Sequence, residues 1–282
     1  MPDFDVNAWL RRIGHDGPRD PSLATLRALI AAHSAAIPFE NIDVLLGRPP
    51  KLDLASLAGK LVAGGRGGYC FELNALLRAG LTALGFQVAG LLGRVIRGMA
   101  PDAQRPATHM ALRVDLPEGS FLADVGFGNQ TPTTALLFRA HEAQVTPHET
   151  MRLLPVEDEF AVQVLLGGAW ESLYRLSPRP ALNADYEVAN WFAATHPDSP
   201  FVSHLIAARP GPDGVRLTLF NSRMTTRRPP DGLDRVALDD AAMVHAALTG
   251  TFGLRLAAAD LTATLDVLDR KGTRHATHPF FI

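Results

Sequence analysis

The sequence predicts an α+β fold in which helices come first, antiparallel strands follow, and a mixed segment closes the chain. Apolar residues recur at helical spacing up to about residue 85, after which the pattern changes to the alternation typical of strands. Beyond residue 185, helical and strand patterns are mixed. At 282 residues the chain is long enough for one large unit or two to three small ones. We therefore expect three packed sub-domains.

Leucine-rich patterns at helical spacing predict the helices of the first part. Ser22 is a favourable N-cap, because its hydroxyl can accept a hydrogen bond from a backbone N–H of the first turn. Gly85 is a residue type that commonly follows the end of a helix in the left-handed conformation. The helices expected from these signals span residues 23–30, 54–62 and 70–84.

Alternating apolar residues separated by turn residues predict the strands of the middle part, which we expect to form an antiparallel sheet or a small barrel. Pro117, Glu118 and Gly119 suit a type I turn between two of these strands. The expected strands span residues 86–96, 108–116, 121–125, 160–166 and 170–176. In the last part we expect a strand over 215–220 and helices over 186–195 and 239–248.

The charge balance argues against a nucleic-acid-binding protein. The chain has 27 Lys+Arg against 29 Asp+Glu, a net charge of −2, whereas phosphate binding needs a cationic surface. A basic run at residues 223–228 is interpreted as a loop, because prolines and acidic residues follow it. The first residues lack the pattern of a signal peptide, and no apolar stretch reaches the roughly 18 residues of a membrane span. We expect a soluble, cytoplasmic protein without membrane contact.

Cys70 is the single cysteine, so an internal disulfide and a four-cysteine zinc site are both excluded. It follows Gly67 and Gly68 and precedes a helical pattern, which places its thiol in the first turn of a helix. There the unpaired N–H groups and the helix dipole favour the thiolate, which is the nucleophilic form. The two glycines allow a substrate to approach the sulfur closely. The alternative interpretation is a buried structural cysteine.

His109 and Asp124 lie on consecutive strands joined by the predicted turn. If Leu116 pairs with Gly119, then Asp124 faces Ala111, and His109 becomes its diagonal neighbour on the same face, roughly 7–8 Å away between backbones. A thiolate nucleophile commonly works with a base that a third group orients, so these side chains are candidates for both roles. Taken singly, the histidine could instead be a satisfied strand residue and the aspartate a turn-capping carboxylate.

Two weaker signals lie near this constellation. Gly126 and Gly128 follow the acid and could let backbone amides reach an acyl oxygen or a phosphate. Arg66 and Glu40 are candidates for an ion pair that braces the cysteine loop, or else for two separate surface charges.

Several motifs, taken as a set and in order along the chain, resemble those of the arylamine N-acetyltransferases. The signature around the cysteine is RGGYCFELN at 66–74. The other matching segments are PFEN at 38–41, THM at 108–110, ADVGFG at 123–128, DY at 185–186, HPDSPF at 196–201 and FG at 252–253. The resemblance spans most of the chain.

The resemblance implies a fold of three parts with a cysteine-protease-like Cys-His-Asp core. An N-terminal helical bundle at 1–85 would carry the nucleophile, and a central antiparallel β-barrel at 86–190 would carry the histidine and the acid. An interdomain helix and an α/β lid would occupy 191–282. These expectations agree with the order of helices and strands read from the residues.

The resemblance also implies roles for individual residues. Cys70 would be the acyl-accepting nucleophile, His109 its base, and Asp124 the residue that orients the imidazole. The positions that match acetyl-CoA contacts are Thr108, Phe127 and Gly128. The positions that match the lining of the arylamine pocket are Phe39, Val95 and Phe127.

The activity implied is a ping-pong transfer of an acetyl group from acetyl-CoA to an aromatic amine or hydrazine through an acetyl-cysteine, in a protein that could form a homodimer. No metal is expected, because His275 and His278 have no third ligand in view. Three alternatives remain open: a macrolactam-forming amide synthase, a papain- or transglutaminase-like cysteine hydrolase with the same three residue types, and a non-catalytic binding protein that keeps the scaffold.

Overall fold

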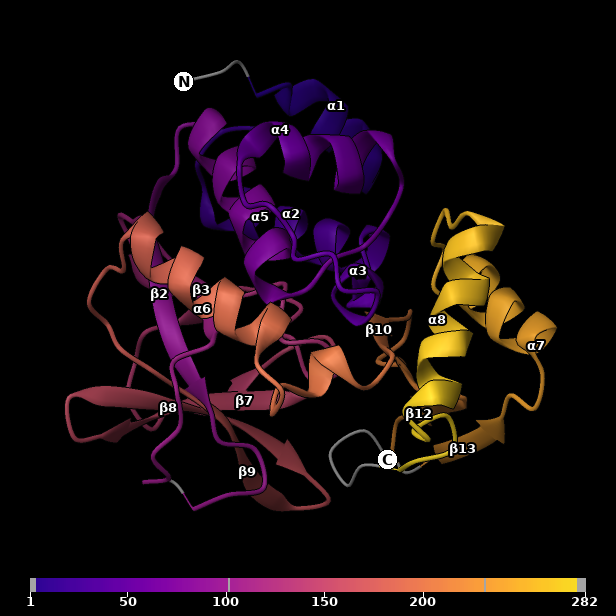
Figure 1. The fold of residues 1–282 in the computed structure, drawn as a ribbon. Coiled ribbons are helices and arrows are strands. Elements are labelled where there is room, and N and C mark those ends of the chain that lie inside the picture. The colour runs from indigo at the N-terminus through magenta and orange to yellow at the C-terminus, as the bar shows by residue number, and fades with distance from the viewer. Residues whose placement is uncertain (1–3, 101, 231, 278–282) are drawn as a thin grey trace.

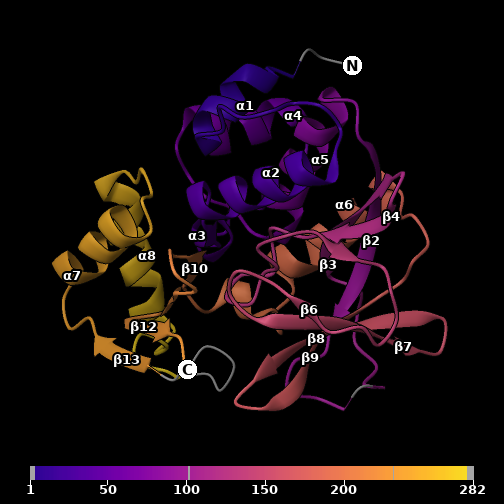
Figure 2. The same cartoon turned by 180° about the vertical axis from the view of Figure 1, so that it is seen from behind.

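The structure is a computed structural model that describes residues 4–100, 102–230 and 232–277. Figure 1 shows a group of N-terminal helices above a curved sheet, with a C-terminal region of strands and helices beside both. The view from behind shows the same arrangement (Figure 2). The predicted α+β fold is therefore confirmed.

Helices build the N-terminal region. They are α1 (Val6–Ile13), α2 (Leu23–Ala36), α3 (Ile42–Leu45), α4 (Leu54–Leu57) and α5 (Cys70–Ala83). The predicted N-cap is confirmed, since Ser22 Oγ accepts a hydrogen bond from Thr25 N at 3.3 Å. Gly85 follows α5 with a φ of +88°, in the region that favours glycine. Residues 58–63 extend α4 as a π-helix.

An eight-stranded sheet follows the helices. Its strands are β2 (Gln87–Val95), β3 (His109–Leu116), β4 (Gly119–Ala123), β5 (Leu136–Leu137), β6 (Gln144–Val145), β7 (Thr150–Val156), β8 (Glu159–Leu166) and β9 (Ala169–Leu176). They lie antiparallel in the order β5-β4-β3-β2-β9-β8-β7-β6, in a barrel-like sheet (Figure 2). The predicted hairpin register is confirmed, because Leu116 pairs with Gly119 and Leu112 with Ala123.

A second, five-stranded sheet forms most of the C-terminal region. Its strands are β1 (Phe39–Glu40), β10 (Ile206–Pro210), β11 (Arg216–Phe220), β12 (Arg223–Arg228) and β13 (Gly232–Ala237). Because β1 pairs with β10, this sheet is anchored to the helical region. The remaining helices are α6 (Asn183–Thr195), α7 (Ala241–Ala246) and α8 (Ala258–Arg270), with a 3₁₀ turn at Pro200–Val202 and a π-helix at Ala247–Thr251. Within the described ranges, no helix is both long and apolar enough to cross a bilayer.

The basic run at 223–228 is strand β12, so the loop interpretation is wrong. This strand pairs with β11 on one side and β13 on the other. Met224 packs against the apolar cluster of the C-terminal region, and Arg227 forms an ion pair with the buried Glu149. The sequence did not predict this strand, because arginine and threonine occupy the positions where alternating apolar residues would indicate a strand.

The largest apolar cluster joins the helices to the barrel sheet. Leu73 and Leu76 of α5 belong to it together with Leu112 and Val114 of β3, and all four are 0% exposed. Full burial of one such side chain contributes about 1.5–3 kcal/mol. The cluster therefore holds the helix that begins at the cysteine firmly against the strand that begins at the histidine.

The segment before Cys70 packs against β1 without room for a side chain. Gly68 O accepts a hydrogen bond from Glu40 N at 3.0 Å, and Gly68 N donates to Pro38 O at 3.3 Å. A Cβ atom at Gly67 would lie 2.2 Å from Pro38 O. Because the obstacle is backbone, glycine is required at this position by the close approach of two chains.

We expect Gly67→Ala to lower the free energy of unfolding by about 1–3 kcal/mol, because two backbone segments must separate to admit the methyl group. Urea denaturation measures this loss. Gly250→Ala is the matched control, since an added Cβ there meets no heavy atom within 4 Å. Equal stability of the two variants would contradict the close packing of the cysteine loop.

Candidate active site

Cys70 is the first residue of α5, and it is only 4% exposed. Its Sγ donates a hydrogen bond to Thr108 O at 3.7 Å, across to the residue before β3. Glu72, in the first turn of the same helix, accepts a hydrogen bond from Tyr69 N at 3.1 Å and so caps the helix start. The thiol thus lies where free backbone N–H groups favour negative charge.

His109 begins β3 and brings its imidazole beside the thiol. Its Nε2 lies 2.7 Å from Asp124 Oδ2, and both side chains are buried. The Cys70 side chain also hydrogen bonds to the imidazole. Because Nε2 is engaged by the carboxylate, Nδ1 is the ring nitrogen left to the sulfur. The structure therefore brings together the three residues that the sequence analysis named.

Asp124 is 0% exposed and is surrounded by hydrogen-bond donors. Tyr174 Oη donates to its Oδ2 at 2.8 Å, the same oxygen that contacts the imidazole. Asn74 Nδ2 donates to Oδ1 at 2.9 Å, and Gly126 N donates to Oδ1 at 2.8 Å. A buried carboxylate is tolerable only when its oxygens are satisfied in this way.

Asn74 and Tyr174, which both donate hydrogen bonds to Asp124, were not predicted from the sequence. Asn74 follows Cys70 by one helical turn and shares its face of α5, a spacing that could have revealed it. Its Nδ2 also donates to Met110 O at 2.7 Å, which joins α5 to β3. Tyr174 lies on β9, where it pairs with Val95 of β2, and its ring centroid is 4.6 Å from that of the histidine. No local sequence pattern predicts this position of Tyr174, because only the pairing of β9 with β2 brings its side chain next to His109 and Asp124.

The charges of His109 and Asp124 shift each other's pKa. Burial lowers the pKa of His109, but the Asp124 carboxylate and the sulfur outweigh it and raise that pKa to about 10. Burial likewise raises the pKa of Asp124, whereas the imidazolium and the hydrogen bonds from Asn74 and Gly126 lower it, with a net shift downward. The site therefore favours an imidazolium next to an ionised carboxylate.

Five charged side chains brace the loop in front of the cysteine. Arg66 Nε donates to Glu40 Oε1 at 2.9 Å, which confirms the predicted ion pair and excludes two separate surface charges. Lys60 Nζ lies 2.7 Å from Asp43 Oδ2 and 2.7 Å from Glu72 Oε1. Burial raises the pKa of Glu72 to about 7, although Lys60 opposes the shift. These partly buried ion pairs tie the loop to α3 and to the π-helix.

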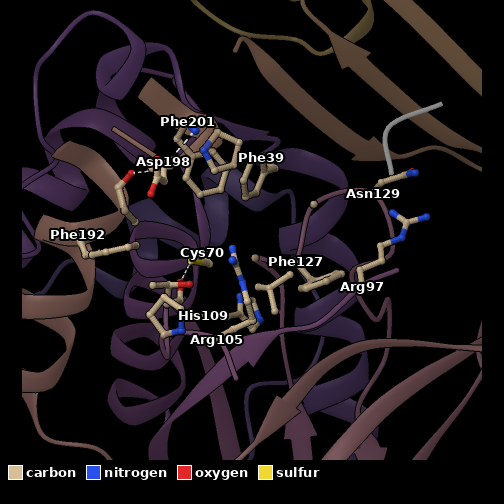
Figure 3. A pocket seen from close by; sticks show the side chains of 18 of the residues that line it. Phe39, Cys70, Arg97, Arg105, His109, Phe127, Asn129, Phe192, Asp198 and Phe201 are labelled. Atoms are coloured by element: carbon tan, nitrogen blue, oxygen red, sulfur yellow. Dashed lines mark hydrogen bonds between the residues drawn. The ribbon is translucent and has the colours of Figure 1, made fainter. Parts of the chain in front are cut away.

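A cavity of about 320 Å³ opens onto Cys70 and His109 (Figure 3). Each position that the sequence analysis assigned to acetyl-CoA or to the amine lines it: Phe39, Val95, Thr108, Phe127 and Gly128. Asp124 is absent from the described lining residues and lies behind the imidazole. Lining residues without an earlier assignment include Arg97, Arg105, Phe192, Asp198 and Phe201.

Gly126 and Gly128, which follow Asp124, differ in their contacts. Gly126 N donates a hydrogen bond to Asp124 Oδ1 at 2.8 Å, so this amide is engaged within the protein. A Cβ at Gly126 would lie 2.7 Å from Cys70 Cα, which shows how closely this turn approaches the helix start. Gly128 adopts a φ of +80° and lines the cavity.

The histidines considered for a metal do not build a site in the described chain. His275 Nδ1 lies 3.2 Å from Ser222 Oγ, and His278 lies outside the described residues. Over residues 4–100, 102–230 and 232–277, no three His, Cys, Asp or Glu side chains gather as metal ligands would.

A cysteine at a helix start, facing a histidine and an acid on the adjacent sheet of an α+β fold, defines the class of cysteine-protease-like folds. Comparison with known proteins shows which family within this class the chain belongs to. A family model described as N-acetyltransferase matches residues 22–261. The arylamine N-acetyltransferase of Mycobacterium tuberculosis is 41% identical over 258 residues, which cover 90% of each chain. That of Escherichia coli is 39% identical over 274 residues, which cover 97% of each chain.

Solved structures agree with the sequence comparison. The arylamine N-acetyltransferase of Mycobacterium marinum matches with a TM-score of 0.89 at 38% identity, over 94% of this chain and 99% of that one. A complex of that relative with CoA matches with the same TM-score of 0.89. The chain therefore belongs to the arylamine N-acetyltransferase family and is an acyltransferase.

We expect His109 to make stability depend on pH. Its folded pKa of about 10 exceeds the ordinary 6.5, so its contribution is fully present below pH 6.5 and is lost as the pH rises through 10. Urea denaturation from pH 6 to 10 measures this. The stability difference between the parent and His109→Gln should shrink as the pH rises, and a difference that grows would contradict the raised pKa.

Proposed function

We propose that the chain transfers an acetyl group from acetyl-CoA to aromatic amines or hydrazines by a ping-pong mechanism through an acetyl-Cys70 intermediate. One observation carries this proposal: Cys70 and His109 hydrogen bond to each other at the floor of one cavity, with Asp124 behind the imidazole. Family membership supports the donor, since a structure of the Mycobacterium marinum relative is a complex with CoA.

In the first half-reaction, the Cys70 thiolate attacks the carbonyl carbon of the acetyl thioester. The carbon–sulfur bond to CoA breaks, and the leaving thiolate takes the proton of the His109 imidazolium. Free CoA, acetyl-Cys70 and a neutral imidazole result. One thioester replaces another, so this step requires little change in free energy. The raised pKa of His109 supports the charged starting pair.

In the second half-reaction, the amine nitrogen attacks the acetyl-Cys70 carbonyl after CoA has left. The neutral imidazole of His109 accepts a proton from the nitrogen, and the Cys70 thiolate is released. An amide forms and the original ion pair returns, so the proton balance closes over the cycle. Asp124 keeps the imidazole oriented throughout, because its other hydrogen bonds hold the carboxylate in place.

Both substrates would use the same cavity in turn. We assign the thioester and the adjoining arm of acetyl-CoA to Thr108, Phe127 and Gly128, and the aromatic ring to Phe39, Val95 and Phe127. The Phe127 ring also packs edge-on against the imidazole at 5.2 Å between centroids. Apolar walls around the thioester reduce access of water, which favours attack by the amine over hydrolysis.

Mixing the protein with acetyl-CoA alone tests the covalent route. We expect intact mass spectrometry to show a gain of one acetyl group, carried by the peptide that contains Cys70. Cys70→Ser should stay folded, remain unmodified and lose acetyl transfer almost completely. Unmodified parent protein, or a Cys70→Ser variant within a few-fold of parental activity, would exclude the acetyl-cysteine.

Tyr174→Phe tests the support of the acid. The change removes one hydrogen bond to Asp124 Oδ2 and keeps the ring, so we expect Cys70 alkylation by iodoacetamide at pH 7 to slow about tenfold. Its pH profile should shift as well, which loss of packing alone would not cause. Tyr186→Phe is the matched control, since that hydroxyl donates to Leu91 O at 3.2 Å. Equal rates in both variants would contradict a positioning role for Tyr174.

A further inference from the structure

The segment that follows β4 carries three parts of the site without belonging to a helix or a strand. Asp124 begins this segment, Gly126 N donates to the acid, and Phe127 packs against the imidazole. The next strand, β5, starts only at Leu136. Because no strand ladder holds residues 124–131, other hydrogen bonds must fix where the acid and the aromatic ring lie.

The Thr131 side chain closes this segment into a turn. Its Oγ1 donates a hydrogen bond to Asp124 O at 2.9 Å and accepts one from Phe127 N at 3.3 Å. Thr131 N also donates to Gly128 O at 3.2 Å, so one residue binds three points of the chain before it. Thr131 is only 3% exposed. A hydroxyl has one hydrogen to donate, and here it goes to the backbone of the acid.

The C-terminal sheet fixes Thr131 from the other side. Arg216 of β11 is 1% exposed, and its Nη2 donates to Thr131 O at 2.9 Å. The same guanidinium donates to both carboxylate oxygens of Glu149, which is also buried. A buried ion pair therefore holds the carbonyl group of Thr131, while the hydroxyl of Thr131 holds the turn.

The contacts of Thr131 reach the reacting groups through two neighbours. Thr131 is absent from the described residues that line the Cys70 cavity. Its hydroxyl instead binds the backbone of the acid that orients the imidazole, and the backbone of Phe127, whose ring centroid lies 5.2 Å from that of the imidazole. Without the hydroxyl, both backbone groups would lose this partner. Unpaired buried polar groups are unfavourable, so we expect the turn to shift until they find others.

We propose that Thr131 is a positioning residue for acyl transfer, and that its hydroxyl holds the turn in which Asp124 meets the imidazole and Phe127 packs against it. The inference rests on the proposed function, since it concerns the pair of Cys70 and His109 that reacts. A shift of about 1 Å in a catalytic group is enough to slow a reaction strongly. Because the thiolate depends on a correctly placed imidazole, the reactivity of the sulfur reports on Thr131.

Thr131→Val tests the proposal, because valine keeps the shape of threonine and lacks the hydroxyl. We expect Cys70 alkylation by iodoacetamide at pH 7 to slow about tenfold, since the imidazole is held less firmly. Thr131→Ser keeps the hydroxyl and should react within about twofold of the parent. Thr264→Val is the matched control: Thr264 is 0% exposed, and its Oγ1 donates to Asp260 O at 2.7 Å within α8, so the parental rate should persist.

Three results would overturn the inference: a parental rate in Thr131→Val, a Thr131→Ser variant as slow as Thr131→Val, or equal slowing in Thr264→Val. The last would mean that any lost buried hydroxyl has the same effect. If Thr131→Val does not fold, Thr131→Ala is compared with Thr131→Ser, because these two variants differ by the hydroxyl alone. We then expect the alanine variant to react more slowly, and equal rates would refute the positioning role.

Turnover separates this inference from the proposed function. With acetyl-CoA and 4-aminophenol we expect Thr131→Val to lower kcat at an unchanged KM for the amine, because the residue positions the reacting groups. A raised KM at parental kcat would assign Thr131 to substrate binding and overturn the inference. If the parent gains no acetyl group on Cys70, the proposed function fails, whereas the alkylation rates still decide the role of Thr131.

Discussion

Asp124 is a fully buried carboxylate, and the rest of the site is arranged around it. Leaving such a charge without partners would cost several kcal/mol, so its oxygens must receive donors from whichever elements surround them. Here the donors come from α5, β3, β9 and the turn after β4, through Asn74, His109, Tyr174 and Gly126. One buried charge thereby holds together elements that are distant in the sequence.

The orientation of the reactive groups follows from this anchor. Because Asp124 engages Nε2 of His109, the other ring nitrogen is directed to the sulfur of Cys70. Ion pairs also hold the start of the helix that carries the sulfur. Glu72 accepts a hydrogen bond from Tyr69 N at the helix start and forms an ion pair with Lys60. The thiol is thus confined between a carboxylate-bound imidazole and a braced loop, which is the preorganisation that acyl transfer requires.

Local signals in the sequence were sufficient to predict the helix that begins at Cys70 and the hairpin that contains His109. Glycines before Cys70 and a leucine pattern after it predict a helix that starts at the cysteine, and α5 does so. The turn between Leu116 and Gly119 predicts the register that places His109 and Asp124 on one face, and the hairpin adopts it. Such features are short-range, because turn chemistry and residue spacing act over a few neighbours.

By itself, then, the sequence determined the α+β order of the elements, the position of Cys70 at a helix start and the hairpin register that brings His109 and Asp124 to one face. The tertiary structure alone decided which distant group completes the site, because Tyr174 reaches Asp124 from β9. It also decided that the basic run at residues 223–228 forms strand β12, which pairs with β11 on one side and with β13 on the other. The physical reason is that burial and charge pairing between remote segments depend on how the sheets and helices pack, which no local pattern records.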